Sequence, residues 1–190
     1  MKNLFRFIAP KGKPIKRRWA LLALAAAALT VAASAMAAPS GKSAFGFNAS
    51  EISGFPTGVV FLTGGGAYDP ESGFVHSAGG FRCTSDVSQG PLAGCLAGQG
   101  VRWDTANLLR GTSFKCTGQK DEALKPVATD EHTAVLLADF YRAGNGNDES
   151  FTAQLIVSDN DIASDIPGVQ NVWIQGVGCA SANVNFNAAG

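Results

Sequence analysis

Apolar and polar residues alternate with a period of two along most of the chain after residue 38, which is typical of β-strands with one buried face. In the run from Phe151 to Val157, every odd-numbered residue is apolar, and Thr152 and Gln154 between them are polar. Helical periodicity is scarce in the same region. Six further short strands are predicted at residues 43–48, 58–63, 73–82, 132–141, 172–179 and 183–186.

Turn-forming residues separate these strands. Asp69–Gly73 is a Pro/Gly loop of hairpin length, and residues 144–149 form a strong turn signal. The run Gly64–Gly66 is expected to break or bulge its strand. A long connection is predicted at about residues 84–111, with a helical turn at 104–110. We therefore expect an all-β fold, an antiparallel sandwich or barrel that forms a single domain over residues 38–190.

Residues 1–37 have the pattern of a secretory signal peptide. A basic run at Lys11–Arg18 precedes an uncharged apolar segment, and small residues, Ala35 and Ala37, stand where a peptidase needs them. Cleavage is expected after Ala37. The alternatives are an uncleaved anchor over the 19 residues 19–37 and a twin-arginine signal at Arg17–Arg18. An Ala-rich leader of this kind is typical of bacteria, which predicts a periplasmic or extracellular product.

Removal of the leader changes the charge of the chain. The full sequence has 15 basic and 15 acidic residues, but residues 1–37 hold seven of the basic ones and no acidic one. The remainder carries a formal charge of about −7, from 8 Lys and Arg against 15 Asp and Glu. Because such a chain repels phosphate backbones, nucleic acid is not expected as a partner. No transmembrane anchor is expected after cleavage.

All four cysteines lie beyond the leader, and an even number in an exported chain predicts two disulfides. The preferred pairing is Cys83–Cys95 with Cys116–Cys179. A similar order of aromatic, basic, Cys and Thr residues at 81–84 and 114–117 favours Cys83–Cys116 as the alternative. Zinc is not expected, because there is no Cys-x-x-Cys pair and the chain has two histidines.

Catalytic signals are weak. The sequence contains no Gly-x-Ser-x-Gly elbow and no His-Glu-x-x-His motif. A barrel enzyme, either a hydrolase or a cyclase/isomerase, would have to use His76 as its base, with Tyr68 or Asp69 beside it. The competing interpretation of His76 is a half-buried strand residue with one hydrogen bond.

Two sets of residues are candidates for binding. Asp159 and Asp161 could supply hard oxygen ligands to Ca²⁺, although their spacing is not that of an EF-hand, and residues 145–149 form a second such loop. No other cofactor is expected. For a small ligand or an envelope component, the first candidates are Arg102, Trp103 and Asp104, which lie in the predicted long connection, where a tryptophan could form an exposed platform.

Three segments resemble small exported bacterial proteins of unknown function. They are Gly-Ala-Tyr-Asp-Pro-Glu-Ser-Gly-Phe-Val-His-Ser at 66–77, Gly-Pro-Leu-Ala-Gly-Cys at 90–95 and the stretch 167–179. The resemblance extends over most of residues 55–187 and implies no activity or functional residue. The sequence therefore predicts an exported, disulfide-containing β-rich protein, either a non-enzymatic binding or envelope-associated module or, as the alternative, an enzyme that uses His76.

Overall fold

The computed structural model describes residues 41–142 and 149–188, and within them the fold is all-β, without a helix. These strands belong to one compact unit over Pro39–Gly190. The predicted leader, residues 1–37, and most of the predicted turn at 144–149 lie outside the described residues. The strands are β1 (Ser43–Gly54), β2 (Val59–Asp69), β3 (Phe74–Ser85), β4 (Arg102–Leu108), β5 (Gly111–Phe114), β6 (Lys125–Ala128), β7 (Thr133–Tyr141), β8 (Glu149–Ser158), β9 (Val172–Ile174), β10 (Gly178–Ala180) and β11 (Asn183–Ala188).

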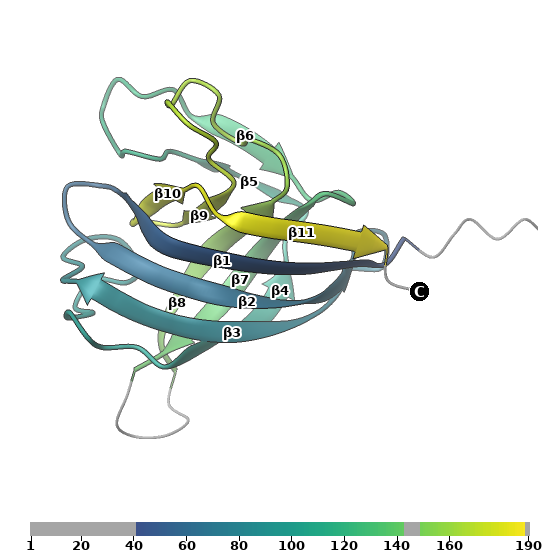
Figure 1. The fold of residues 1–190 in the computed structure, drawn as a ribbon, viewed down its shortest axis with the longest axis horizontal. Coiled ribbons are helices and arrows are strands. Elements are labelled where there is room, and N and C mark those ends of the chain that lie inside the picture. The colour runs from purple at the N-terminus through teal and green to yellow at the C-terminus, as the bar shows by residue number, and fades with distance from the viewer. Residues whose placement is uncertain (1–40, 143–148, 189–190) are drawn as a thin grey trace, which may run out of the picture. The chain divides into compact units, whose positions relative to one another are not determined.

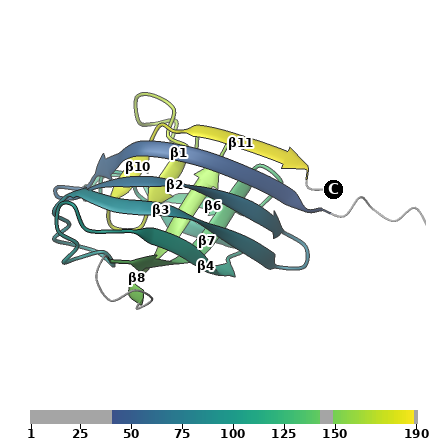
Figure 2. The same ribbon diagram turned by 60° about the horizontal axis from the view of Figure 1, so that its bottom comes forward.

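Nine strands form one antiparallel sheet in the order β10-β9-β8-β7-β4-β3-β2-β1-β11. The sheet curls until β10 also pairs with β1 at Ser53 and Gly54, which closes it into a barrel (Figures 1 and 2). After a break at residues 181–182, β11 pairs with the beginning of the same strand, over residues 43–48. The expected all-β fold is confirmed in its barrel form.

Aromatic side chains fill the interior of the barrel. Because side chains alternate between the two faces of a strand, the odd-numbered residues Phe45 and Phe47 of β1 both point inward. Phe47 packs against Trp103 with ring centroids 6.0 Å apart, and Phe81 packs edge-on against Phe140 at 4.9 Å. Other buried members of this cluster are Ile52, Val60, Leu62, Tyr68, Leu136, Leu155 and Ile174.

Strand β2 runs unbroken through Gly64–Gly66, so the expected break at these glycines is wrong. Gly64 lies at an inward position, opposite Phe47 of β1 and Gly79 of β3. A side chain there would begin 2.7 Å from the ring of Trp103. The glycines therefore leave room for the large rings that neighbouring strands send into the barrel, one of the uses of glycine within a strand.

A second core lies on the outer face of the sheet. The two-stranded sheet of β5 and β6, together with the loop that follows β8, packs over β7, β8 and β9. Trp173 is buried in this second core against Phe114, with ring centroids 5.5 Å apart. The further buried members are Cys116, Val135, Ile156, Ala163 and Cys179.

The helical turn expected at 104–110 is wrong, because β4 occupies residues 102–108 and pairs with β7. Trp103 lies opposite Phe140 and Leu108 lies opposite Leu136, so apolar partners on β7 stabilise the extended form. The long connection is correspondingly shorter than the predicted 84–111 and spans residues 86–101. Within the described residues, no helix is long and apolar enough to span a membrane.

Candidate functional site

Of the three residues considered for catalysis, Tyr68 lies on the other face of the sheet from His76 and Asp69. Tyr68 is completely buried, and its hydroxyl donates a 2.6 Å hydrogen bond to the carbonyl oxygen of Asp130, while burial raises its pKa far above the usual value. His76 is exposed on the outer face of β3. Asp69 accepts a 2.7 Å hydrogen bond from the Ser72 hydroxyl, which lowers the pKa of its carboxyl group and fixes the turn between β2 and β3. Because Tyr68 and His76 point to opposite faces of the sheet, they cannot act on one substrate from these positions.

Of the three residues predicted to bind a ligand, Trp103 is not exposed. Its side chain is fully buried in the barrel, and its indole N–H donates to the carbonyl oxygen of Thr63 at 3.0 Å. The expectation of an exposed aromatic platform is wrong at this position, because the alternation of β4 turns Trp103 inward and its two neighbours outward.

Arg102 and Asp104 lie on the outer face of β4, where their side chains bind each other. They form a 3.1 Å ion pair, and the guanidinium group lies 4.0 Å from the ring centre of Tyr141. The Tyr141 hydroxyl donates to the second oxygen of Asp104 at 3.2 Å. Burial and the adjacent carboxylate raise the pKa of Tyr141. This cluster fixes the edge of β4 against β7.

Asp159 and Asp161, the candidates for Ca²⁺, have different protein partners. Asp159 accepts a hydrogen bond from Nδ1 of His132 at 2.8 Å, whereas Asp161 accepts hydrogen bonds from the backbone N–H groups of Ala163 and Gln170 at 3.0 and 3.1 Å. No cluster of three or more His, Cys, Asp or Glu side chains suited to a metal lies within residues 41–142 and 149–188. The second candidate loop, 145–149, falls almost wholly outside the described residues.

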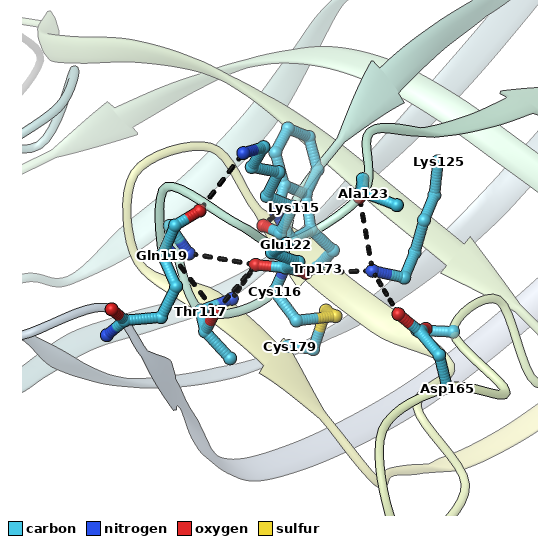
Figure 3. Close-up of polar contacts among 12 residues, drawn as sticks. Lys115, Cys116, Thr117, Gln119, Glu122, Ala123, Lys125, Asp165, Trp173 and Cys179 are labelled. Atoms are coloured by element: carbon cyan, nitrogen blue, oxygen red, sulfur yellow. Dashed lines mark hydrogen bonds and ion pairs between the residues drawn. A yellow bond between two sulfur atoms is a disulfide. The ribbon is translucent and has the colours of Figure 1, made fainter.

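The preferred disulfide pairing is confirmed, and the alternative pairing of Cys83 with Cys116 is wrong. Cys83–Cys95 joins β3 to the connection that follows it, across 12 residues. Cys116–Cys179 joins the loop after β5 to β10, across 63 residues (Figure 3). Two disulfides are typical of proteins that fold in an oxidising compartment.

Glu122 organises the loop beside the second disulfide, and no feature of the sequence indicated it (Figure 3). Its carboxylate accepts the backbone N–H groups of Cys116 and Thr117 at 2.6 and 2.8 Å, and the Lys125 ammonium lies 2.8 Å away. Burial alone would raise the pKa of this carboxyl group, but the hydrogen bonds from Lys125, Thr117 and the amides lower it to about 2. Lys125 also forms a 2.9 Å ion pair with Asp165, which ties the β5–β6 sheet to the loop after β8.

A groove of about 740 Å³ opens on the outer face of β2 and β3. Phe61 and Val101 supply apolar walls, and Val101 is 54% exposed. Gly80 and Gly100 line it without side chains. Arg82 is the one ionisable side chain among the described residues that line this outer groove, and it forms no ion pair with any other described residue.

The shorter disulfide holds one side of the outer groove in place. Cys83–Cys95 anchors the connection, which then runs back along β3 as an additional strand-like segment. The N–H of Cys83 donates to the carbonyl oxygen of Gln99 at 2.7 Å, and the N–H of Phe81 donates to that of Val101 at 3.3 Å. The glycines permit the necessary path, since Gly100 has a φ of +114°. The outer groove is therefore a fixed feature of the fold.

The described part of the chain is thus a disulfide-bonded antiparallel β-barrel with a packed interior and an open groove on its outside. Comparison with models of protein families, with curated proteins and with solved structures found no match to the chain.

Proposed function

We propose that the protein is an exported bacterial binding module that contacts a small ligand or an envelope component through the outer groove. The barrel acts as a rigid scaffold, and the interior takes no part in binding. Catalysis by His76 has no support from its position, because the side chain is exposed on the outer face, away from Tyr68.

Export is supported by two independent features of the chain. The basic and apolar pattern of residues 1–37 is that of a signal peptide. Both disulfides need an oxidising compartment to persist, and every cysteine of the described residues is in one of them. A periplasmic or extracellular location meets both requirements.

The observation that carries the binding proposal is the contrast between the two sides of the sheet. Lipocalin-type barrels hold ligands inside, but here Phe45, Phe47 and Trp103 occupy that space. The outer groove, in contrast, has a volume within the range of about 300–1,000 Å³ that is usual for small-molecule sites. Its apolar walls and single charged side chain are also usual for such sites.

Export is tested by expressing the full chain in a bacterium and analysing the protein recovered from the periplasm and the medium. Intact mass and amino-terminal sequencing are expected to show a chain that starts at Ala38, with no thiol available for alkylation before reduction. An intact leader with four alkylatable cysteines would contradict the export proposal.

Binding is tested on the same oxidised protein, labelled with ¹⁵N and screened against a library of small soluble fragments by NMR. The amide resonances of Phe61, Gly80, Arg82 and Gly100 are expected to shift together, while the indole resonance of Trp103 stays unchanged. Fragments that instead move Trp103 and Tyr68, or that never move the groove resonances, would refute the proposed binding site.

A further inference from the structure

We propose that the outer groove binds an anionic amphiphile, a molecule with a flat or chain-like apolar body that carries one carboxylate or similar anion. This inference rests on the proposed function, since it names the ligand class of the same site. Three observations lead to it: the charge of Arg82, the apolar walls and the absence of side chains at the glycines.

Arg82 supplies the charge selectivity. It projects from β3 on the outer face, because its neighbours Phe81 and Cys83 are buried on the inner one. Arg102, the other arginine of β1 to β4, already pairs with Asp104 and lies against the ring of Tyr141. No acidic side chain lines the described groove, so nothing in its lining competes for the guanidinium group. The planar fork of an arginine matches the geometry of a carboxylate or phosphate with two parallel hydrogen bonds.

The apolar part of the ligand is expected to lie between Phe61 and Val101. Phe61 is directly opposite Arg82 across the β2–β3 pair, so the ring and the cation belong to neighbouring positions of one surface. Val101 is 54% exposed on the facing side, an apolar surface that a ligand would remove from water. An apolar body held by these two residues would place its anionic group at Arg82.

Gly80 shows that the space for the ligand depends on a missing side chain. A Cβ atom added there would lie 3.2 Å from the side-chain methyl group of Thr63, so β3 can accept a side chain at this position once that methyl group shifts by a few tenths of an ångström. Gly80 lines the outer groove, and a leucine in its place would fill it. The substitution Gly80→Leu therefore blocks the site while it leaves the barrel interior unchanged.

The inference is tested with two probes of nearly equal shape, naphthalene-2-carboxylate and naphthalene-2-methanol. Each is titrated into the oxidised protein expressed from the full chain, and binding is followed by NMR. The carboxylate is expected to bind about tenfold more tightly than the alcohol, as a charge-assisted pair would provide. Arg82→Gln is expected to reduce the affinity for the carboxylate to that for the alcohol. Gly80→Leu is expected to abolish the binding of both.

Arg110→Gln is the matched control, because Arg110 is an exposed arginine that lines a different cavity, beside the turn between β2 and β3. It is expected to leave both affinities unchanged. Retained amide spectra and disulfides verify that each variant is folded.

The outcomes separate this inference from the proposed function. Equal binding of both probes in the groove, or no effect of Arg82→Gln, overturns the anionic ligand class and leaves the groove as a binding site. Failure of the carboxylate to bind overturns the inference as well. If, in addition, no fragment of the library moves the groove resonances, the proposed function fails with it.

Discussion

Replacement of Glu122 by glutamine is expected to destabilise the protein through the loss of one buried charge. The carboxylate accepts hydrogen bonds from the amides of Cys116 and Thr117, from the Thr117 hydroxyl and from the Lys125 ammonium. Its side chain is only 5% exposed, so solvent screens these contacts little. Glutamine has nearly the same shape, but it carries no charge. Its N–H₂ group would face hydrogen-bond donors of the loop, to which it cannot bond as an acceptor.

The magnitude follows from the pKa of the carboxyl group. Its ordinary value of 4.5 falls to about 2 in the folded protein. Because one pH unit corresponds to about 1.4 kcal/mol, the charge stabilises the folded state by about 3 kcal/mol at neutral pH. A lowered pKa gives stability that is complete above pH 4.5 and is lost as the pH falls towards 2.

The assay is urea denaturation of the oxidised protein and of Glu122→Gln, at pH 6.5 and at pH 3. The free energies of unfolding are expected to differ by about 3 kcal/mol at pH 6.5 and by about half of that at pH 3, as the linkage relation requires. Asp121→Asn is the matched control: this neighbouring carboxylate is exposed, and its substitution is expected to change the stability by less than about 0.5 kcal/mol.

Two results would refute the reasoning. A difference of the same size at both pH values would show that the shape of the side chain, and not its charge, stabilises the loop. A difference below about 1 kcal/mol at pH 6.5 would show that the disulfide and the second core hold the loop without the carboxylate.

Three further predictions concern other parts of the molecule. In two separate variants, both cysteines of one disulfide are replaced by alanine. Loss of Cys116–Cys179 is expected to lower the free energy of unfolding by about 4 kcal/mol and loss of Cys83–Cys95 by about 3 kcal/mol, because these disulfides close loops of 63 and 12 residues. Equal losses in guanidinium denaturation would contradict this order. Gly79→Ala is expected to cost about 1–3 kcal/mol or more in a thermal-unfolding assay, since its Cβ would clash with the backbone carbonyl oxygen of Thr63. The adjacent Gly80→Ala is expected to cost less, because its Cβ would press only on the side-chain methyl group of Thr63, at 3.2 Å. Similar losses for both would refute the packing argument. Asp159 raises the pKa of His132 by a hydrogen bond and by its charge. Asp159→Asn is therefore expected to lower that pKa towards 6.5 in an NMR titration. An unchanged titration curve would show that the two side chains do not interact.

The sequence predicts most of the barrel because its strands are amphipathic. Phe45 and Phe47 alternate with small or polar residues, and a strand with one buried face follows directly from that spacing. Two of the errors in the predicted fold have a tertiary cause. Gly64–Gly66 carry the local signal of a break, but pairing with β1 on one side and β3 on the other keeps β2 extended. The stretch after Trp103 could form a helical turn by itself, and only its pairing with β7 makes it a strand.

The candidate site was harder to predict than the fold. Arg82 stands in the segment Phe81-Arg82-Cys83-Thr84, where the alternation indicates an outward side chain but not what lies beside it. The groove depends on the connection after β3, whose return path is set by Cys83–Cys95 and by backbone hydrogen bonds. Glu122 gave no signal at all, because its partners are mostly backbone amides that become neighbours only when the loop folds.

The position of β1 has a consequence for the order of events when the protein is made. One edge of this first strand pairs with β2, but the other waits for the last two strands, β10 and β11. A chain that emerges amino-terminus first therefore remains an open sheet until β10 and β11 arrive. During that interval Cys116 has no correct partner, because Cys179 is still to come, while Cys83 and Cys95 emerge almost together. Barrel closure and formation of the Cys116–Cys179 disulfide are thus expected together, once β10 and β11 are available.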